Sequence, residues 1–253
     1  MSPTRPSTRP SASRSCRRAA ERGDRADGAG GADVAHALPE RTGRHPGWPA
    51  RLGALRVPVG VVELRPVRLR DASAWSEIRI RDERTLTPWE PSAPGTWAQR
   101  NAVVEWPARW ALLRSAGRRG TALPFAVTCD GRLVGQVMVG NVVREPLLSA
   151  YVGYWCDSRV SGAGVTTAAV ALVIDHCFSA VGLHRLEATV RPENAASLRV
   201  LEKLGFRREG LFARYLDVDG AWRDHLCFAM TVEEVPAGGI VGRLVGRGLA
   251  ERV

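Results

Sequence analysis

The segment Arg159-Val160-Ser161-Gly162-Ala163-Gly164 is the most informative stretch of this 253-residue sequence. It follows a β-rich run, residues 150–156, and precedes an apolar stretch, residues 166–180, so the order predicts a strand, a glycine-containing turn and a buried helix. Two glycines let backbone N–H groups surround a ligand, and the start of a helix adds partial positive charge. Together with the charge of Arg159, the segment predicts a site for an anion such as a pyrophosphate.

Three other interpretations of this segment are a plain turn, a dinucleotide-binding motif and a P-loop. A plain turn between strand and helix is the alternative, because two glycines at this spacing are a weak signal. The dinucleotide spacing G-x-G-x-x-G fails because Thr167 stands at its third glycine, and no lysine follows Gly164 as a phosphate-binding P-loop requires.

The sequence around this segment predicts a mixed α/β fold. Asp130-Gly131 and Asp219-Gly220 each separate two β-rich runs, which is a strong hairpin signal. The helix over 166–180 acts as a crossover and should make the strands on either side of it parallel neighbours. The expected strands are 61–67, 125–129, 133–139, 150–156, 184–191, 207–217 and 221–232, and the expected helices follow Asp71, span 96–115 with a restart at Pro107, and span 166–180 and 194–204.

Composition divides the chain into three parts. Residues 1–44 contain little apolar mass and much Arg, Ser, Pro and Gly, which predicts a disordered basic arm or an over-long start. Residues 45–235 are the expected domain, and residues 236–253 form a weakly amphipathic C-terminal tail. Residues 1–60 hold 11 Arg against 5 acidic residues, a balance of +6, while residues 61–253 hold 24 Arg and Lys203 against 21 acidic residues, only +4. The charge of the domain therefore does not by itself indicate nucleic-acid binding.

Cysteine usage excludes two further classes of site. The five cysteines are odd in number and contain no C-x-x-C spacing, so neither a disulfide framework nor a zinc site is expected. Reduced thiols fit a cytoplasmic protein. No run of 18 apolar residues occurs, which excludes a membrane-spanning helix from the expected fold.

A second motif lies about 30 residues after the first. Asn194 is a good N-cap, and Ser197 stands at the third helical position of the same helix. Alone, the pair indicates an ordinary capped helix.

Taken together, the two motifs resemble the GNAT superfamily of acetyl-CoA-dependent N-acetyltransferases. Arg159 to Gly164 matches the pyrophosphate loop of the superfamily, Arg/Gln-x-x-Gly-x-Gly/Ala. Asn194-x-x-Ser197 with Leu204-Gly205-Phe206 resembles the RimJ/RimL branch of ribosomal-protein alanine N-acetyltransferases. The same branch is resembled by two further segments, Pro88-Trp89-Glu90-Pro91 and residues 219–225. The resemblance covers about residues 60–232.

The resemblance implies a particular sheet and a particular co-substrate. The sheet would be predominantly antiparallel and twisted, with a central pair of splayed parallel strands over 151–156 and 185–191, flanking helices, and a bulge that would explain Gly153. Acetyl-CoA, with no metal, would lie in the gap between those strands. The implied acetyl-CoA-binding residues are Tyr154, Trp155, Cys156, Arg159, Ser161, Gly162, Ala163, Gly164, Val165, Thr166, Asn194 and Ser197.

The resemblance also implies catalytic roles. Ser197 would lie near the thioester sulfur. Some branch members carry an acidic candidate base in the segment where this chain has Ala213-Arg214-Tyr215-Leu216, and Arg214 stands at about that place, so that role does not carry over. The remaining candidate carboxylates are Glu187, Asp224 and Glu90. For Glu187, on the splayed strand, an ion pair to an arginine is as good an alternative as a base role.

The acceptor side is expected at Trp89, Glu90, Asp224 and His225. Trp89 is either a wall of the acceptor cleft or a core residue. Asp224 and His225 are expected as a structural hydrogen-bonded pair beside the groove.

The resemblance thus implies direct transfer of an acetyl group to an amine, with the α-amine of a ribosomal protein's N-terminus as the expected acceptor. A small-molecule amine such as an antibiotic, or a non-enzymatic RNA- or ribosome-binding module, are the alternatives. Neither DNA nor a membrane is expected as a partner, the protein is expected in the cytoplasm, and a monomer and a homodimer both fit.

Overall fold

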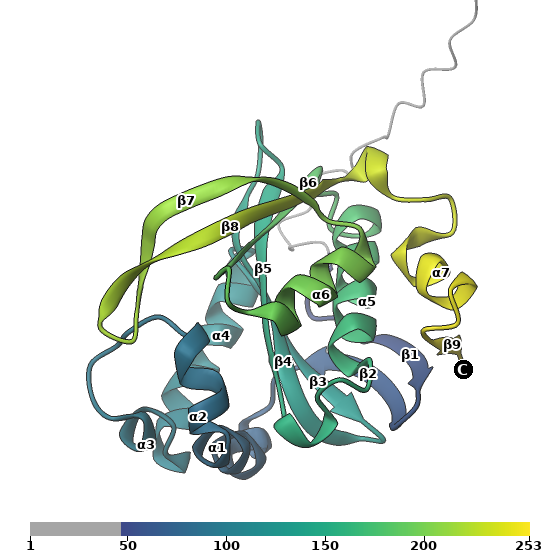
Figure 1. Ribbon diagram of the computed structural model, residues 1–253. Coiled ribbons are helices and arrows are strands. Elements are labelled where there is room, and N and C mark those ends of the chain that lie inside the picture. The colour runs from purple at the N-terminus through teal and green to yellow at the C-terminus, as the bar shows by residue number, and fades with distance from the viewer. Residues whose placement is uncertain (1–46) are drawn as a thin grey trace, which may run out of the picture. The chain divides into compact units, whose positions relative to one another are not determined.

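The computed structural model describes residues 47–253, and the predicted arm, residues 1–44, lies outside this part of the chain. The described residues form one nine-stranded sheet with helices on both faces (Figure 1). Its strand order is β7-β8-β6-β5-β4-β3-β2-β1-β9. The strands are β1 (Leu52–Val57), β2 (Gly60–Pro66), β3 (Leu123–Cys129), β4 (Arg132–Val143), β5 (Ser149–Cys156), β6 (Arg185–Val190), β7 (Arg207–Val218), β8 (Ala221–Thr231) and β9 (Glu251–Arg252). The α-helices are α1 (Ala72–Arg81), α2 (Glu83–Leu86), α3 (Trp97–Arg100), α4 (Trp106–Arg119), α5 (Val165–Ser179), α6 (Ala195–Leu204) and α7 (Gly239–Gly246).

Both predicted hairpins are confirmed. Asp130 and Gly131 join β3 to β4 with φ of 48° and 77°, and Asp219 and Gly220 join β7 to β8 with φ of 54° and 71°. Two successive positive φ values are what a type I′ turn requires, and Asp-Gly supplies them at low cost. Turn chemistry therefore fixes the register of half the sheet.

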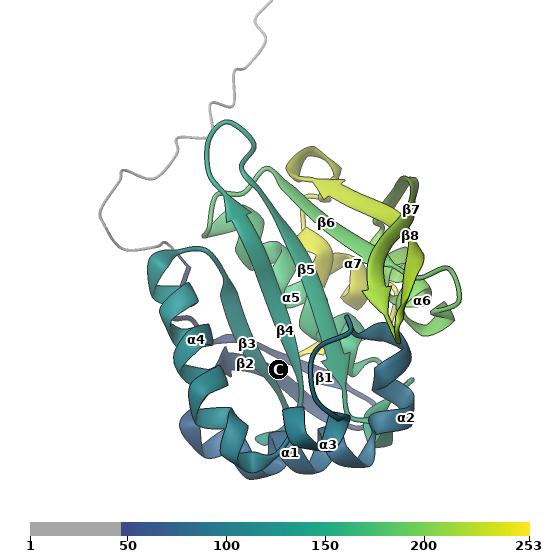
Figure 2. The same ribbon diagram turned by 90° about the vertical axis from the view of Figure 1, so that its left-hand side faces the viewer.

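The central strands β5 and β6 run parallel, as the crossover through α5 predicts. They pair only over Ser149 with Arg185, Ala150 with Leu186, and Tyr151 with Glu187. Residues 152–156 of β5 have no partner on β6, so the two strands diverge toward the carboxyl end of β5 (Figure 2). The mixed sheet with one splayed parallel pair is therefore confirmed.

The bulge expected at Gly153 is not found. Gly153 pairs with Met138 in regular register, and the irregularity in the β4–β5 ladder lies between Gly140 and Val143. A Cβ atom placed on Gly153 would meet no atom within 4 Å. The glycine thus borders open space at the splay rather than a distorted ladder.

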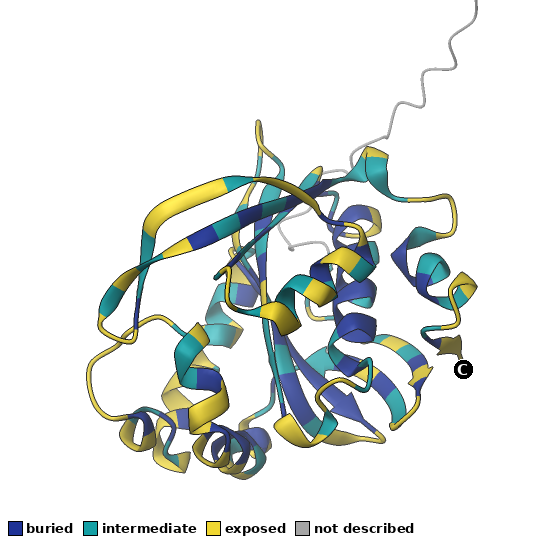
Figure 3. Cartoon of the chain, in the orientation of Figure 1, coloured by how far each residue is buried: buried dark blue, intermediate teal, exposed yellow. Residues whose placement is uncertain are grey.

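Two apolar layers hold the helices to the sheet. α5 packs on one face and is the most buried helix, while α1 and α4 cover the other face (Figures 2 and 3). The layer under α1 and α4 contains Trp75 and Trp106, whose ring centroids are 5.0 Å apart. Pro107 lies in the first turn of α4, where its missing N–H costs nothing, as the predicted restart requires.

The ends of the described chain contribute more than the sequence predicts. β1 precedes the first predicted strand and pairs with β2. The segment expected as a C-terminal tail forms α7 and β9, and Ile240 and Leu244 are buried in the main core. Both segments carry apolar residues, and only the sheet and α5 beside them supply a surface on which these can be buried.

Asp71 does not cap α1 as expected. Its carboxylate instead accepts hydrogen bonds from Arg65 and from the Arg68 backbone N–H, which holds the turn before the helix.

The tip of the β7–β8 hairpin contacts the loop before α3. Ser92 donates its N–H to the Asp217 carbonyl at 2.8 Å, and its hydroxyl bonds the Asp217 carboxylate at 2.8 Å. The Gly220 N–H donates to the same hydroxyl at 3.1 Å, and Pro91 bridges to Val218. The hairpin is therefore attached at its tip as well as along β6.

Candidate functional site

A cavity lined by both sequence motifs opens where β5 and β6 diverge. Its volume is about 440 Å³, and it extends from the turn before α5 to the first turn of α6. Ten of the twelve expected acetyl-CoA-binding residues line it: Tyr154, Trp155, Cys156, Ser161, Gly162, Gly164, Val165, Thr166, Asn194 and Ser197. The two motifs recognised in the sequence thus form one continuous site.

The glycine turn exposes backbone donors to this cavity. Gly162 and Gly164 adopt φ of 79° and 86°, values that side chains with a Cβ atom resist. The first intrahelical bond of α5 at this end is donated by Ala168 to Gly164, so the N–H groups of Val165, Thr166 and Thr167 have no partner in residues 47–253. These amides and the helix dipole favour an anion at the mouth of the cavity.

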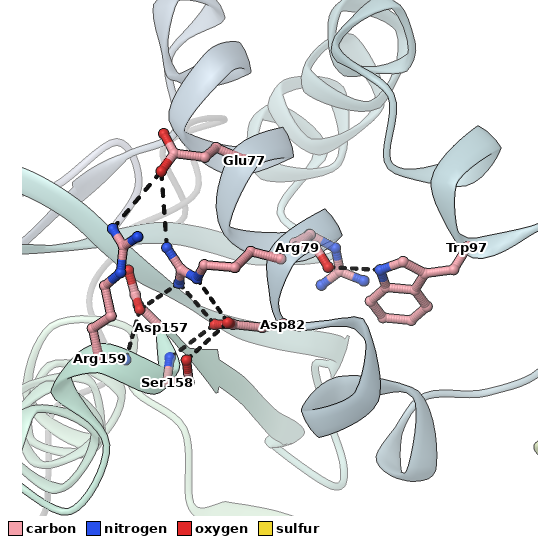
Figure 4. Close-up of polar contacts among 8 residues, drawn as sticks. Glu77, Arg79, Asp82, Trp97, Asp157, Ser158 and Arg159 are labelled. Atoms are coloured by element: carbon pink, nitrogen blue, oxygen red, sulfur yellow. Dashed lines mark hydrogen bonds and ion pairs between the residues drawn. The ribbon is translucent and has the colours of Figure 1, made fainter.

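A buried ion-pair network holds this turn against α1 (Figure 4). The Asp82 carboxylate accepts bonds from the Ser158 N–H and the Ser158 hydroxyl, each at 2.8 Å, and a bidentate pair from Arg81 at 2.9 Å. Arg81 also donates to Asp157 at 2.5 Å. Burial alone would raise the pKa of Asp82, but the bonds from Arg81 and Ser158 outweigh it and lower that pKa below its usual value. The network positions the turn and was not predicted from the sequence.

Two expected acetyl-CoA-binding residues do not line the cavity. The Arg159 guanidinium lies 3.8 Å from the Glu77 carboxylate, toward which it points, and both side chains are 66% exposed (Figure 4). Ala163 is likewise absent from the lining. An exposed ion pair of this kind contributes between 0 and about 1 kcal/mol, so it leaves Arg159 able to exchange Glu77 for an anion.

The helix cap brings Ser197 to the other end of the cavity. The Asn194 side chain accepts the Ser197 N–H at 3.0 Å, which confirms the predicted cap. The Ser197 hydroxyl is hydrogen-bonded to the Tyr154 hydroxyl at 2.8 Å. Burial raises the pKa of Tyr154 to about 12, so its phenol keeps its proton at neutral pH. Tyr154 and Ser197 form a connected pair of hydroxyl donors that sequence reasoning treated separately.

A smaller cavity of about 190 Å³ adjoins the first and shares five of its residues. It is lined by Trp89, Val152, Gly153, Tyr154, Ala188, Thr189, Val190, Arg191, Asn194, Ser197 and His225. The Arg191 guanidinium lies 5.4 Å from the centre of the Trp89 ring and donates to the Pro88 carbonyl, which fixes that ring as one wall. Trp89, expected as either a wall or core, is 36% exposed and lines both cavities.

The structure does not bring Glu187 to the Ser197 end of the site. Its carboxylate accepts a bond from Arg185 at 2.6 Å and lies in neither cavity lining. The alternative stated for this residue, a strand carboxylate paired with an arginine, describes the observed geometry.

Asp224 and His225 are not a bonded pair. They are neighbours on a strand and therefore point to opposite sides of it. Asp224 accepts the N–H of Arg214, whose φ is 49°, at an irregularity in the β7–β8 ladder. His225 is 4% exposed and bonds the Arg223 carbonyl through Nδ1 at 3.0 Å. The expectation was wrong because it used sequence adjacency instead of strand alternation.

Glu90 lines the larger cavity and is held by a buried arginine. Arg79 donates to Glu90 at 2.5 Å, and its guanidinium lies within 6 Å of the ring centres of Trp75, Trp97 and Trp155. Trp97 in turn donates its ring N–H to the Arg79 carbonyl (Figure 4). This packing makes the wall beside Trp155 rigid.

Sequence reasoning missed several lining residues of the larger cavity. These come from α2, β4 and the outer face of α6: Thr85, Leu86, Gln136, Met138, Arg199, Val200 and Lys203. The spacing of Arg199 and Lys203, one helical turn apart on the helix that starts at Asn194, was a usable signal. The other positions depend on the sheet order, which no local motif encodes.

The one cysteine in the lining is not set up as a nucleophile. Burial raises the pKa of the Cys156 thiol to about 11, so the reactive thiolate is scarce at neutral pH. Within residues 47–253 no cluster of His, Cys, Asp or Glu could hold a metal ion, and no helix there is long and apolar enough to span a membrane.

Comparison with known proteins gives one consistent family. The model of the acetyltransferase (GNAT) domain matches residues 62–207. The solved structure of Mycobacterium smegmatis RimJ in complex with CoA-disulfide is 55% identical, with a TM-score of 0.81, and the match covers 83% of this chain and 100% of that one. The Escherichia coli ribosomal protein uS5-alanine N-acetyltransferase is 27% identical over 194 residues, 76% of this chain and 98% of that protein. The Bacillus subtilis protein named Probable N-acetyltransferase YjcK is 43% identical over 101 residues, which span 56% of its length and 40% of this chain.

Proposed function

Since this chain belongs to the GNAT acetyltransferase family, in its RimJ/RimL branch, we propose that it transfers the acetyl group of acetyl-CoA to the N-terminal α-amine of a ribosomal protein in the cytoplasm. By its name, the Escherichia coli relative is an alanine N-acetyltransferase of ribosomal protein uS5, and the structure of the Mycobacterium smegmatis relative is a complex with CoA-disulfide. The observation that carries the proposal is the continuous cavity from the free amides of α5 to the Tyr154–Ser197 pair.

The residues present fit acetyl-CoA along the whole cavity. The amides of Val165 to Thr167 and the glycine turn would hold the pyrophosphate. The unpaired edge of β5 over residues 152–156 would bond the pantetheine arm, together with Asn194. Acetyl-CoA supplies an activated acyl group, and the protein supplies its position and the proton donor at its sulfur.

The chemistry fits direct transfer from acetyl-CoA to the amine. The Ser197 hydroxyl, bonded to Tyr154, is placed to donate a proton to the departing thiolate. A covalent enzyme intermediate on Cys156 is disfavoured by the raised pKa of its buried thiol. The free N–H groups at the splayed edge of β5 would polarise the thioester carbonyl.

The smaller cavity favours a small first residue on the acceptor. At about 190 Å³, and walled by Trp89 and Val152, it leaves little room beside Ser197 for a long side chain. An α-amine also suits a site without a strong base, since about a tenth to a fifth of it is neutral at pH 7, against about one part in a few thousand for a lysine.

A turnover assay with acetyl-CoA tests this proposal. Peptides that begin with Ala, Ser, Leu or Trp, the same peptides with blocked N-termini and an internal lysine, and small amines including aminoglycosides would be compared by kcat/KM. We expect the free Ala and Ser peptides to be preferred and the blocked peptides to be inert. Preference for a small amine would replace the acceptor part of the proposal, and failure to bind CoA would refute it altogether.

A further inference from the structure

We propose that His225 is the proton acceptor for the attacking amine, acting through Nε2. The inference rests on the proposed function and goes beyond it, because it names the base that the branch pattern leaves vacant at Arg214. Its evidence is the placement of one buried imidazole in the cavity that also contains Ser197.

The tautomer of His225 follows from its hydrogen bond. Nδ1 lies 3.0 Å from the Arg223 carbonyl oxygen, and a carbonyl only accepts, so Nδ1 carries the hydrogen. In the neutral ring Nε2 then carries the lone pair. No other group of residues 47–253 bonds that nitrogen. The imidazole is therefore oriented with its basic nitrogen available.

The position of the ring matches the required task. His225 is 4% exposed, yet it lines the 190 Å³ cavity together with Ser197, Tyr154 and Trp89. The Tyr215 ring meets the imidazole edge-on with centroids 5.7 Å apart, which restricts its rotation. An amine that attacks a thioester beside Ser197 would thus have a hydroxyl near the leaving sulfur and an imidazole in the same small space.

No carboxylate competes for this role. The lining of the smaller cavity contains no Asp or Glu. Glu187 is bonded to Arg185, Glu90 to Arg79, and Asp224 to the Arg214 N–H on the other side of β8.

The charged and titratable groups around the imidazole come from four elements. Arg191 follows β6 and lines the same cavity, Tyr154 comes from β5, and Tyr215 comes from β7. On β8 itself, Cys227 lies two residues along on the same face of the strand.

The proposed step transfers the acetyl group directly from the sulfur of the thioester to the nitrogen of the amine. The nitrogen lone pair of the amine forms the new C–N bond to the acetyl carbon, and the C–S bond of the thioester breaks. The proton lost by the nitrogen goes to Nε2 of His225, and the leaving thiolate takes a proton from the Ser197 hydroxyl. Solvent returns both residues to their starting protonation states.

The experiment uses His225→Asn in the full chain. Asparagine keeps a side-chain N–H that can reach the Arg223 carbonyl, and it removes Nε2. His184→Asn is the matched control, because His184 is exposed and bonds only Glu233 outside the site. The measurements are kcat and KM for an N-terminal alanine peptide across pH 5 to 9, CoA affinity by calorimetry, and melting temperature.

We expect His225→Asn to lose about 100-fold or more in kcat while CoA affinity stays within about twofold of wild type. In the acid limb, the slope of log kcat/KM against pH should fall from about 2 in the wild type to about 1 in the variant, because only the amine of the peptide still titrates. The His184→Asn control should keep the wild-type profile.

Three results would overturn the inference. A folded His225→Asn protein with kcat within about threefold of wild type removes the need for a base at this position. A loss of activity with an unchanged slope of about 2 makes His225 a positioning residue only. If His225→Asn fails to fold, the same measurements are made on His225→Gln. A slope of about 1 for log kcat/KM against pH in the acid limb of the wild type would also refute a base at His225. A wild type that binds CoA but acetylates no amine refutes the proposed function, and the inference falls with it.

Discussion

Replacing Asp82 by alanine should destabilise the protein and weaken CoA binding together, although Asp82 touches neither cavity. Asp82 holds the turn that precedes the glycine segment through the two bonds from Ser158. Hydrogen bonds to a charged group contribute about 1.5–3 kcal/mol each. The bonds from Arg81 contribute less, because Arg81 is 26% exposed and keeps Asp157 as a partner. The sum after relaxation is about 3 kcal/mol.

That free energy corresponds to a melting temperature lowered by about 6–12 °C in a domain of this size. The KM for acetyl-CoA should rise as well, because the turn that holds the glycines at positive φ loses its anchor. Thermal unfolding and calorimetric titration with CoA on one preparation measure both effects. Glu77→Gln is the matched control, since Glu77 is 66% exposed with ion pairs of 3.8 and 3.9 Å, and should change stability by no more than about 0.5 kcal/mol.

The stability effect should also depend on pH. The pKa of Asp82 is lowered in the folded protein, so its contribution is present above the pKa of the unfolded chain and is lost as the pH falls through the folded value. The difference in melting temperature between wild type and Asp82→Ala should therefore close below about pH 4. An Asp82→Ala protein with wild-type melting temperature and CoA affinity at pH 7 would refute the anchoring role.

Three further predictions concern the site and its surroundings. Ser197→Ala should lower kcat about 10- to 100-fold with CoA affinity unchanged, and Tyr154→Phe should lower it less because the serine hydroxyl remains; equal kcat in all three proteins would exclude the hydroxyl pair as donor. Gly162→Val should raise the KM for acetyl-CoA about tenfold or more, because a strain of about 1–2 kcal/mol at a φ of 79° corresponds to that factor; unchanged CoA binding by calorimetry would contradict the loop assignment. Glu209→Gln should cost no more than about 1 kcal/mol at pH 7, and denaturant titrations should show the loss fading from about pH 4.5 to 2, because bonds from Arg185 and then Arg207 lower the pKa of Glu209 to about 2. A loss that persists at pH 2 would count against that pairing.

Local signals in the sequence predicted most of the sheet. The two Asp-Gly turns each depend on a few neighbouring residues, and both were found as expected. β1, α7 and β9 were not predicted, because each is held in place only through contacts with elements distant in sequence. The bulge at Gly153 was expected from a single glycine, whereas the space beside it comes from the divergence of two strands far apart in sequence.

The candidate site likewise combines features that neighbouring residues predict with features that depend on contacts between distant residues. The glycine turn and the Asn194 cap were predictable because each motif is continuous in sequence. The Tyr154–Ser197 bond joins residues 43 positions apart, and the Arg81–Asp157 pair joins residues 76 apart, so neither has a local signature. Arg159 was assigned to the cofactor from its motif position, and its side chain pairs with Glu77 because α1 crosses beside the turn.

The contact at Ser92 means that the β7–β8 hairpin is anchored at both of its ends and not only where it pairs with β6. Its base is fixed by the ladder with β6. Its tip is fixed by three hydrogen bonds between Ser92 and the hairpin residues Asp217 and Gly220, and by the Pro91–Val218 pairing. A hairpin held at both ends undergoes thermal motions of much smaller amplitude than one held at a single end. The hairpin that carries His225 and Tyr215 is thus a fixed support for the smaller cavity, whose shape is set before any ligand enters it.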